Sequence, residues 1–141
     1  MVTDTNVNGL FLMARRAVPV MLAAGRGRII NISMNRQTIR RQGFSPYGPS
    51  KAALEFETII WAQDLADTGV TVNALLLGGA SLTGMMPEGV PDIMIEPLPW
   101  PASIASDGVT GRRLVASQWN PELPQAGPPK GATDLAGWAE P

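Results

Sequence analysis

The first third of the chain alternates between a helical and a strand-like spacing of apolar residues. Between residues 7 and 22 apolar positions recur at three- and four-residue steps, which predicts a helix with one buried face. The expected buried face consists of Val7, Leu10, Phe11, Ala14, Val18, Met21 and Leu22. Gly25 and Gly27 follow and predict the end of this helix. The short β-branched run of Ile29, Ile30 and Ile32 then predicts a strand that is covered on both faces.

A second helix and a second strand follow in the middle of the chain. A loop over residues 34–45 leads to Ser45, Pro46 and Pro49, which are residues typical of a helix start, and we expect this helix to run from Pro49 to about Asp67. It is apolar on two sides and therefore needs two packing partners. Residues 70–77 predict a second buried strand. Strand, helix and strand in this order predict a β-α-β unit with a parallel pair.

The remaining third has weaker patterning. Five prolines between residues 87 and 101 argue against a long helix there, and residues 114–116 predict a last short strand. From residue 120 onward prolines, glycines and small residues predominate, which predicts a flexible tail. The expected organisation is one α/β domain over residues 1–119 followed by a tail over residues 120–141.

Composition narrows the possible chemistry. The chain has 141 residues with neither cysteine nor histidine. These absences exclude Ser-His-Asp and Cys-His nucleophile systems, disulfides, and zinc or iron–sulfur sites with Cys or His ligands. Acid–base chemistry must therefore use Tyr47, a lysine or a carboxylate, and we expect no metal site.

The distribution of charge and apolar residues bears on nucleic-acid binding, membrane insertion and cellular location. Residues 1–51 carry eight basic residues against one acid, whereas residues 52–141 carry three against eleven. The basic residues are scattered without interleaved aromatics, so we do not expect nucleic-acid binding. The apolar stretch over residues 9–24 is interrupted by Arg15 and Arg16, so we expect no membrane span and a cytoplasmic location.

One pair of residues has a spacing suited to proton transfer. Tyr47 and Lys51 are four residues apart, so on a helix they share one face. A nearby ammonium favours the phenolate form and lowers the pKa of a phenol, which makes it a usable proton donor and acceptor. By itself the Tyr-x-x-x-Lys spacing also fits two residues that share a surface by chance.

Five ordered segments resemble the short-chain dehydrogenase/reductase family. They are Asn6-Val7-Asn8-Gly9-Leu10-Phe11, Gly27-Arg28-Ile29-Ile30-Asn31-Ile32-Ser33, Tyr47-x-x-x-Lys51, Val70-Thr71-Val72-Asn73-Ala74 and Gly108-Val109-Thr110-Gly111. The resemblance implies NAD(P)-dependent interconversion of alcohols and carbonyls, with a small-molecule alcohol or carbonyl as substrate.

The resemblance also implies roles for individual residues. Tyr47 would be the catalytic acid/base, and Lys51 would assist it and bind the nicotinamide ribose of NAD or NADP. Asn6 would hold a water in the proton relay, although it is equally compatible with an ordinary helix-start asparagine. Gly78 and Thr83 would contact the cofactor in the turn after the second strand.

One position departs from the family pattern. Met34 stands where the family places its substrate-polarising serine, and a thioether cannot donate a hydrogen bond to a carbonyl oxygen. Ser33 is the candidate substitute for that catalytic role. The alternative is a hydroxyl group satisfied by the backbone.

The order of the segments predicts which part of the family fold is present. No Gly-x-x-x-Gly-x-Gly or Gly-x-Gly-x-x-Gly run occurs in the chain. We therefore expect the C-terminal half of a short-chain dehydrogenase/reductase only: an α/β fold forming the C-terminal part of a Rossmann-like doubly wound parallel sheet, without the glycine-rich dinucleotide motif.

Two hypotheses about function are compatible with these residues. In one, the chain is a fragment of a longer oxidoreductase to which the activity belongs. In the other, it is a non-catalytic dimerisation module or an inactive remnant of such an enzyme. The resemblance implies homo-oligomer formation through helices over residues 5–24 and 49–67 in either case.

Overall fold

The structure, a computed structural model, describes residues 1–78, 95, 97–119 and 133–135. Within these residues the strands form one sheet in the order β1-β2-β3-β4. β1 pairs with β2 and β2 with β3 in parallel, whereas β4 pairs antiparallel with β3. The strands are β1 (Gly27–Ser33), β2 (Val70–Leu76), β3 (Arg112–Val115) and β4 (Thr133–Leu135).

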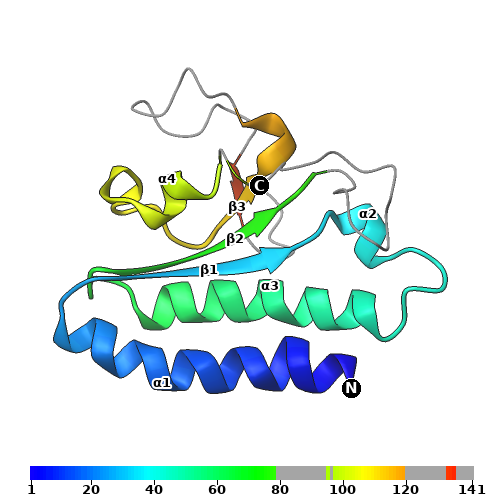
Figure 1. Cartoon of the computed structure of the whole chain (residues 1–141), viewed down its shortest axis with the longest axis horizontal. Helices are drawn as coiled ribbons and strands as arrows, with labels where there is room; N and C mark the ends of the chain where they lie inside the picture. Colours follow the sequence, from blue (N-terminus) through cyan, green and yellow to red (C-terminus); the bar gives the residue numbers. More distant parts are fainter. Residues whose placement is uncertain (79–94, 96, 120–132, 136–141) are drawn as a thin grey trace.

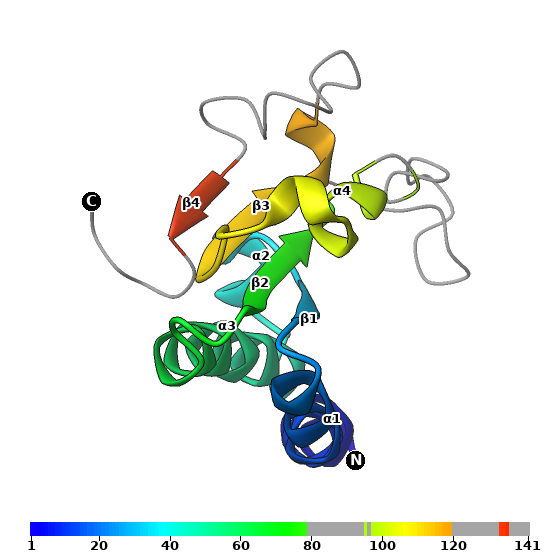
Figure 2. The same cartoon turned by 90° about the vertical axis from the view of Figure 1, so that its left-hand side faces the viewer.

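The helices lie on both faces of this sheet. Figures 1 and 2 show α1 and α3 side by side on one face and α4 on the opposite face. The described chain contains η1 (Asp4–Gly9), α1 (Leu10–Ala23), α2 (Arg36–Ile39), α3 (Tyr47–Asp64), α4 (Pro99–Ala102), η2 (Ile104–Ser106) and η3 (Ala116–Gln118). Over the described ranges, no helix combines the length and the apolarity that crossing a bilayer requires.

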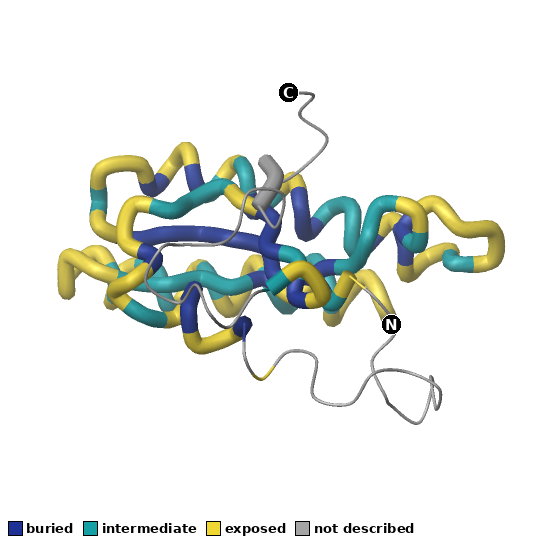
Figure 3. The backbone as a smooth tube through the Cα atoms, turned by 90° about the horizontal axis from the view of Figure 1, so that it is seen from above, coloured by how far each residue is buried: buried dark blue, intermediate teal, exposed yellow. Residues whose placement is uncertain are grey.

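The predicted β-α-β unit is confirmed. β1 and β2 pair in parallel over seven residues, from Gly27 opposite Val70 to Ser33 opposite Leu76, with α3 between them in the chain. Every residue of β2 is buried, because α1 and α3 cover one of its faces and the α4 segment covers the other. Figure 3 shows β2 as the continuous buried band through the middle of the molecule.

The first helix differs from the prediction in its burial. It ends as predicted at Gly25, which adopts a positive φ of 65° and closes the helix with a backbone bond to Leu22. None of its residues is fully buried, and only Val18 and Met21 pack against the core. The predicted buried face was wrong for Phe11 and Leu22, which are exposed, because α1 touches only the edge of the sheet.

The second helix begins two residues earlier than predicted. α3 starts at Tyr47, so that Tyr47 and Lys51 are both helical. Its buried residues follow helical spacing along one stripe: Gly48, Ser50, Leu54, Glu55, Thr58 and Ala62. Phe56 and Ile60 on the other apolar side are 46% and 49% exposed, so no part of the described chain covers that side of the helix.

Two short elements were not predicted from the sequence. The loop over residues 34–45 contains the one-turn helix α2, whose start is capped by Asn35 accepting a hydrogen bond from the Thr38 amide at 2.7 Å. Backbone pairing also places strand β4 inside residues 120–141, where we predicted a tail. The rest of that tail lies outside the described residues.

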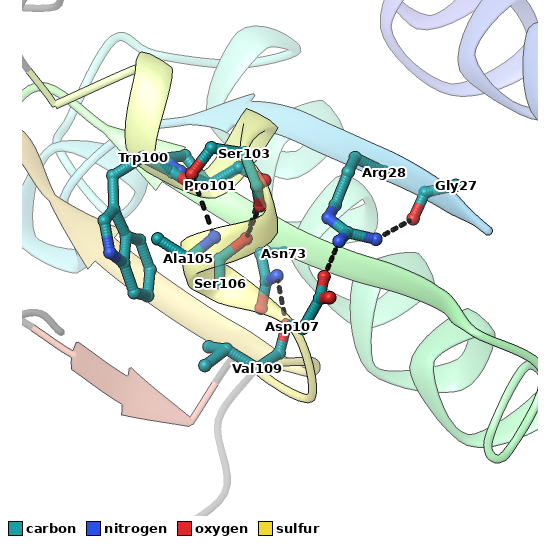
Figure 4. Close-up of polar contacts among 10 residues, drawn as sticks. All are labelled: Gly27, Arg28, Asn73, Trp100, Pro101, Ser103, Ala105, Ser106, Asp107 and Val109. Carbon is teal, nitrogen blue, oxygen red and sulfur yellow. Dashed lines mark hydrogen bonds and ion pairs between the residues drawn. The ribbon is translucent and has the colours of Figure 1, made fainter. Parts of the chain in front are cut away.

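The return from α4 to β3 is held on the sheet by a buried asparagine. Asn73 of β2 donates to the Val109 carbonyl at 2.7 Å and accepts from the Arg112 amide at 3.0 Å. Figure 4 shows the first of these bonds, together with the ion pair between Arg28 of β1 and Asp107. These contacts fasten the Val-Thr-Gly segment beside β2 and so bring β3 into the sheet.

Gly48 marks a close approach between α2 and α3. A Cβ at this position would overlap the backbone carbonyl of Ile39. Alanine normally stabilises a helix interior by about 1 kcal/mol relative to glycine. We expect Gly48→Ala to destabilise the protein by about 2 kcal/mol instead, because backbone has to move. Chemical denaturation measures the change in the free energy of unfolding, and Gln63→Ala on the exposed side of α3 is the control. A Gly48→Ala protein more stable than the wild type would contradict the close approach of Gly48 to Ile39.

Candidate active site

Tyr47 and Lys51 lie together on the first turns of α3. The Lys51 ammonium is 5.7 Å from the centre of the Tyr47 ring, within the range of a cation–π contact. Tyr47 is 40% exposed, and its hydroxyl makes no hydrogen bond to the part of the chain that the structure describes. The helix therefore presents an accessible phenol with a positive charge beside it, as the spacing predicted.

The position of Lys51 is set by the end of β1. Its Nζ donates to the Ile32 carbonyl at 2.7 Å. β1 is the outer strand of the described sheet, and Lys51 supplies a donor to its carbonyl edge. Burial lowers the pKa of Lys51 below that of an ordinary lysine, because removing an ammonium from water disfavours the charged form.

Asn6 is connected to the same helix through Ser50. Asn6 lies in the π-helical segment η1 and donates from Nδ2 to Ser50 Oγ at 3.0 Å. Ser50 in turn donates to the Tyr47 carbonyl at 2.7 Å. Sequence reasoning did not single out Ser50, although a serine three residues after Tyr47 is placed for this local bond to the backbone. The chain Asn6–Ser50–Tyr47 fixes η1 against the start of α3.

An open cleft lies beside these residues. It has a volume of about 440 Å³ and is lined by Thr5, Asn6, Gly9, Leu10, Met13, Ile32, Lys51 and Leu54. Among the described residues of this lining Lys51 is the one charged side chain, and most of the surface is apolar. The cleft therefore combines an apolar wall with the polar side chains of Asn6 and Lys51, a combination that is typical of small-molecule sites.

Ser33 lies apart from this group. It is 2% exposed, and its hydroxyl donates to Glu55 Oε1 at 2.6 Å in the interior. Successive side chains of a strand face opposite ways, so Asn31 and Ser33 face α3, whereas Ile32 between them is partly exposed. The structure therefore places the Ser33 hydroxyl against α3 and does not bring it to Tyr47.

The two predicted cofactor contacts after β2 have different outcomes. Gly78 lies two residues beyond β2, at the same sheet edge as the ends of β1 and β3, with a positive φ of 74°. Side chains of Val115 and Ser117 occupy the space that a Cβ would need there. Thr83 lies outside the described residues.

Comparison with protein families identifies the class of this chain. The family described as short chain dehydrogenase matches residues 1–93. The match includes Asn6, Tyr47 and Lys51 as well as the whole β-α-β unit. The chain belongs to the short-chain dehydrogenase family.

Curated relatives are similar over the same part of the chain. A short-chain type dehydrogenase/reductase of Picea abies is 36% identical over 93 residues, which is 66% of this chain and 34% of the relative. The 3-oxoacyl-[acyl-carrier-protein] reductase FabG of Staphylococcus epidermidis is 32% identical over 100 residues, 70% of this chain and 41% of the relative. The aligned part thus spans less than half the length of these relatives.

Solved structures show the same architecture. Acetoin dehydrogenase YohF from Salmonella typhimurium superposes with a TM-score of 0.70 at 27% identity, covering 86% of this chain and 56% of the other. A gluconate 5-dehydrogenase from Burkholderia cenocepacia, solved with NADP and tartrate, gives 0.69 at 26% identity, covering 78% and 51%. The chain therefore spans about half of these proteins.

The family match corrects the assignment to a C-terminal half. We predicted a C-terminal half only, with its resemblance running from residue 6 to residue 116. The match instead covers residues 1–93, the N-terminal Rossmann part, and ends before β3. The prediction of a C-terminal part of a doubly wound sheet was therefore wrong, and the supported fold is a Rossmann-like α/β parallel sheet. The error came from short segments such as residues 108–111, which mark a local turn and not a whole half of a fold.

The partly buried ammonium of Lys51 makes stability depend on pH in the alkaline range. Its pKa is lowered in the folded state, so between that value and the ordinary lysine value of 10.5 the unfolded chain binds more protons. We therefore expect the free energy of unfolding of the wild type, relative to Lys51→Met, to rise as pH increases through this interval. Urea denaturation of both proteins at stepped pH measures it. A difference that stays constant with pH would contradict the burial of the charge.

Proposed function

We propose that this chain carries the proton-transfer part of an NAD(P)-dependent oxidoreductase that interconverts small alcohols and carbonyl compounds in the cytoplasm. The observation that carries the proposal is the accessible Tyr47 side chain beside the partly buried Lys51 ammonium, which itself lines an apolar cleft. Family membership supports it, and so does the gluconate 5-dehydrogenase solved with NADP.

The residues present fit the nicotinamide end of such a cofactor. An ammonium group has three N–H donors, of which Lys51 directs one to the Ile32 carbonyl, so further donors can meet ribose hydroxyls. Gly78 brings backbone close to the same sheet edge without a side chain. The sequence contains no glycine-rich phosphate run, so this fit concerns the nicotinamide ribose and not the pyrophosphate.

The reaction needs one proton at the substrate oxygen. A bound nicotinamide supplies or accepts the hydride. Tyr47 Oη donates a proton to the carbonyl oxygen in reduction and takes it from the hydroxyl in oxidation. The Lys51 charge stabilises the phenolate that remains after donation. Asn6, tethered through Ser50, lies in the lining of the cleft where a water would return the proton to Tyr47.

The lining of the cleft indicates the class of substrate. The apolar wall is formed by Leu10, Met13, Ile32 and Leu54, and Lys51 is the charged side chain that the described part of the chain contributes to the lining. Such a surface favours an uncharged substrate with an apolar part next to the reacting alcohol or ketone.

The proposed role of Tyr47 is testable by removing one oxygen atom. We expect Tyr47→Phe to lower turnover about 100-fold or more, because positioned acid–base groups contribute that much, while binding of NADH or NADPH stays within about twofold. Lys51→Met should weaken dinucleotide binding as well as turnover. Fluorescence titration with NADH and NADPH measures binding, and absorbance of the reduced nicotinamide measures turnover over a panel of ketones.

A matched control separates chemistry from folding in this test. Gln63→Ala changes an exposed residue at the far end of α3 and should leave binding and turnover as in the wild type. Full activity of Tyr47→Phe would refute the assignment. A folded wild-type chain that binds neither dinucleotide would favour the non-catalytic interaction module instead.

A second proposed property is self-association through α1 and α3. The specific observation is a set of exposed apolar side chains on these two neighbouring helices: Phe11, Leu12 and Leu22 on α1, and Phe56 and Ile60 on α3. Exposed apolar residues on neighbouring helices are typical of a protein–protein interface. A homo-oligomer that buries both helices is compatible with either the enzyme or the interaction module.

Charge placed on this surface should separate the subunits. We expect Leu12→Arg and Phe56→Arg each to shift the protein from dimer to monomer, because an unpaired guanidinium is costly in an apolar interface. Sedimentation velocity measures the change. Ile104→Arg is the control, since Ile104 is 81% exposed on η2, away from both helices. A wild type that sediments as a monomer at high concentration would refute the proposal.

A further inference from the structure

A buried ion pair connects α3 to β3 beneath the candidate site. Arg113 Nε and Glu55 Oε1 are 3.0 Å apart, and the two side chains are 7% and 1% exposed. Taking two charges out of water costs free energy that their attraction repays only when further hydrogen bonds complete the geometry. The other hydrogen bonds of Glu55 and Arg113 therefore indicate the role of this ion pair.

Two further bonds go to the carboxyl end of β1. Glu55 accepts from the Ser33 hydroxyl at 2.6 Å, and Arg113 Nη2 donates to the Met34 carbonyl at 3.3 Å. One ion pair thus holds two consecutive residues at the point where β1 leaves the sheet. Ser33 is held by its side chain and Met34 by its backbone, so the second contact does not depend on the side chain of Met34.

The residue just before these two is the acceptor of Lys51. The Ile32 carbonyl receives the Lys51 ammonium at 2.7 Å. We infer that Glu55 and Arg113 are positioning residues for Lys51, which act by fixing the end of β1 so that the Ile32 carbonyl holds the ammonium beside Tyr47. This inference rests on the proposed function, in which Lys51 assists Tyr47 and binds the cofactor ribose.

The same arrangement assigns a role to Ser33. Its hydroxyl is committed as a donor to a buried carboxylate, so it contributes to the position of Lys51 and not to contact with a substrate. An ion pair that only stabilised the fold would not need hydrogen bonds to the carboxyl end of β1. Apolar residues of similar volume could fill the space between α3 and β3 at equal or lower cost.

The test replaces the pair without changing net charge and observes Lys51 directly. The chain has two lysines, Lys51 and Lys130, so lysine labelled with 15N gives two side-chain amine signals, and Lys51→Arg assigns them. In Glu55→Met/Arg113→Met we expect the pKa of Lys51 to rise from its lowered value toward that of an ordinary lysine, because the released ammonium becomes hydrated and this relieves the desolvation that lowers its pKa. No cofactor or substrate is present in this titration.

The control variant removes a different buried link, which joins β1 directly to α3. Asn31 Nδ2 donates to Thr58 Oγ1 at 2.9 Å, joining β1 to α3 just before the site. Asn31→Leu/Thr58→Val should lose stability in chemical denaturation but keep the lowered pKa of Lys51. Tyr47 is the titratable group that the structure places beside Lys51, and both variants leave it unchanged. The apolar pair removes one negative and one positive charge together, so the net charge near Lys51 is the same in both variants.

The outcomes separate this inference from the proposed function. A folded Glu55→Met/Arg113→Met protein whose Lys51 pKa stays at the wild-type value overturns the inference, and so does an equal shift in the Asn31→Leu/Thr58→Val control. If circular dichroism shows that Glu55→Met/Arg113→Met is unfolded, Arg113→Lys provides the test instead. A lysine keeps a positive charge beside Glu55 but loses the Nη2 donor to the Met34 carbonyl, so an unchanged Lys51 pKa in this variant overturns the inference. Absence of dinucleotide turnover would refute the proposed function and leave this titration result standing.

Discussion

The parallel pairing of β1 with β2 is the constraint on which the rest of the structure depends. Parallel neighbours cannot be joined by a tight turn, so the chain must return along the sheet before the second strand begins. α3 makes this return, and its first residue is therefore at the carboxyl edge of the strands. Tyr47 and Lys51 lie at this edge because the crossover must begin there, and ligands of open α/β sheets bind at the same edge.

Buried polar groups also fix how the strands and helices are placed relative to one another. Asn73 fastens the segment before β3, and Glu55 with Arg113 connects β3 back to α3 and to the end of β1. Each of these groups would be costly to bury alone, and each is matched by a partner from another element. Such matched groups define one relative placement of the strands and helices, whereas apolar packing tolerates several.

Much of the fold and the central pair of the site were predictable from local patterns. The helical and strand spacings predicted the β-α-β unit, and the four-residue separation predicted that Tyr47 and Lys51 share a face. What failed was burial: Phe11 and Leu22 are as apolar as core residues but lie on the exposed side of α1. The extent of the family resemblance also failed, since short segments carry too little information to say which part of a fold they belong to.

The sequence by itself determined the chemistry available to this protein and the element that carries it. With no histidine or cysteine, proton transfer was left to Tyr47, a lysine or a carboxylate, and the Tyr-x-x-x-Lys spacing depends only on helix geometry. The tertiary structure alone decided that Lys51 meets the Ile32 carbonyl, that Ser33 turns inward to Glu55, and that Ser50 links Asn6 to α3. These contacts join residues that are 19, 22 and 44 positions apart, and only the packing of whole elements determines which such residues meet.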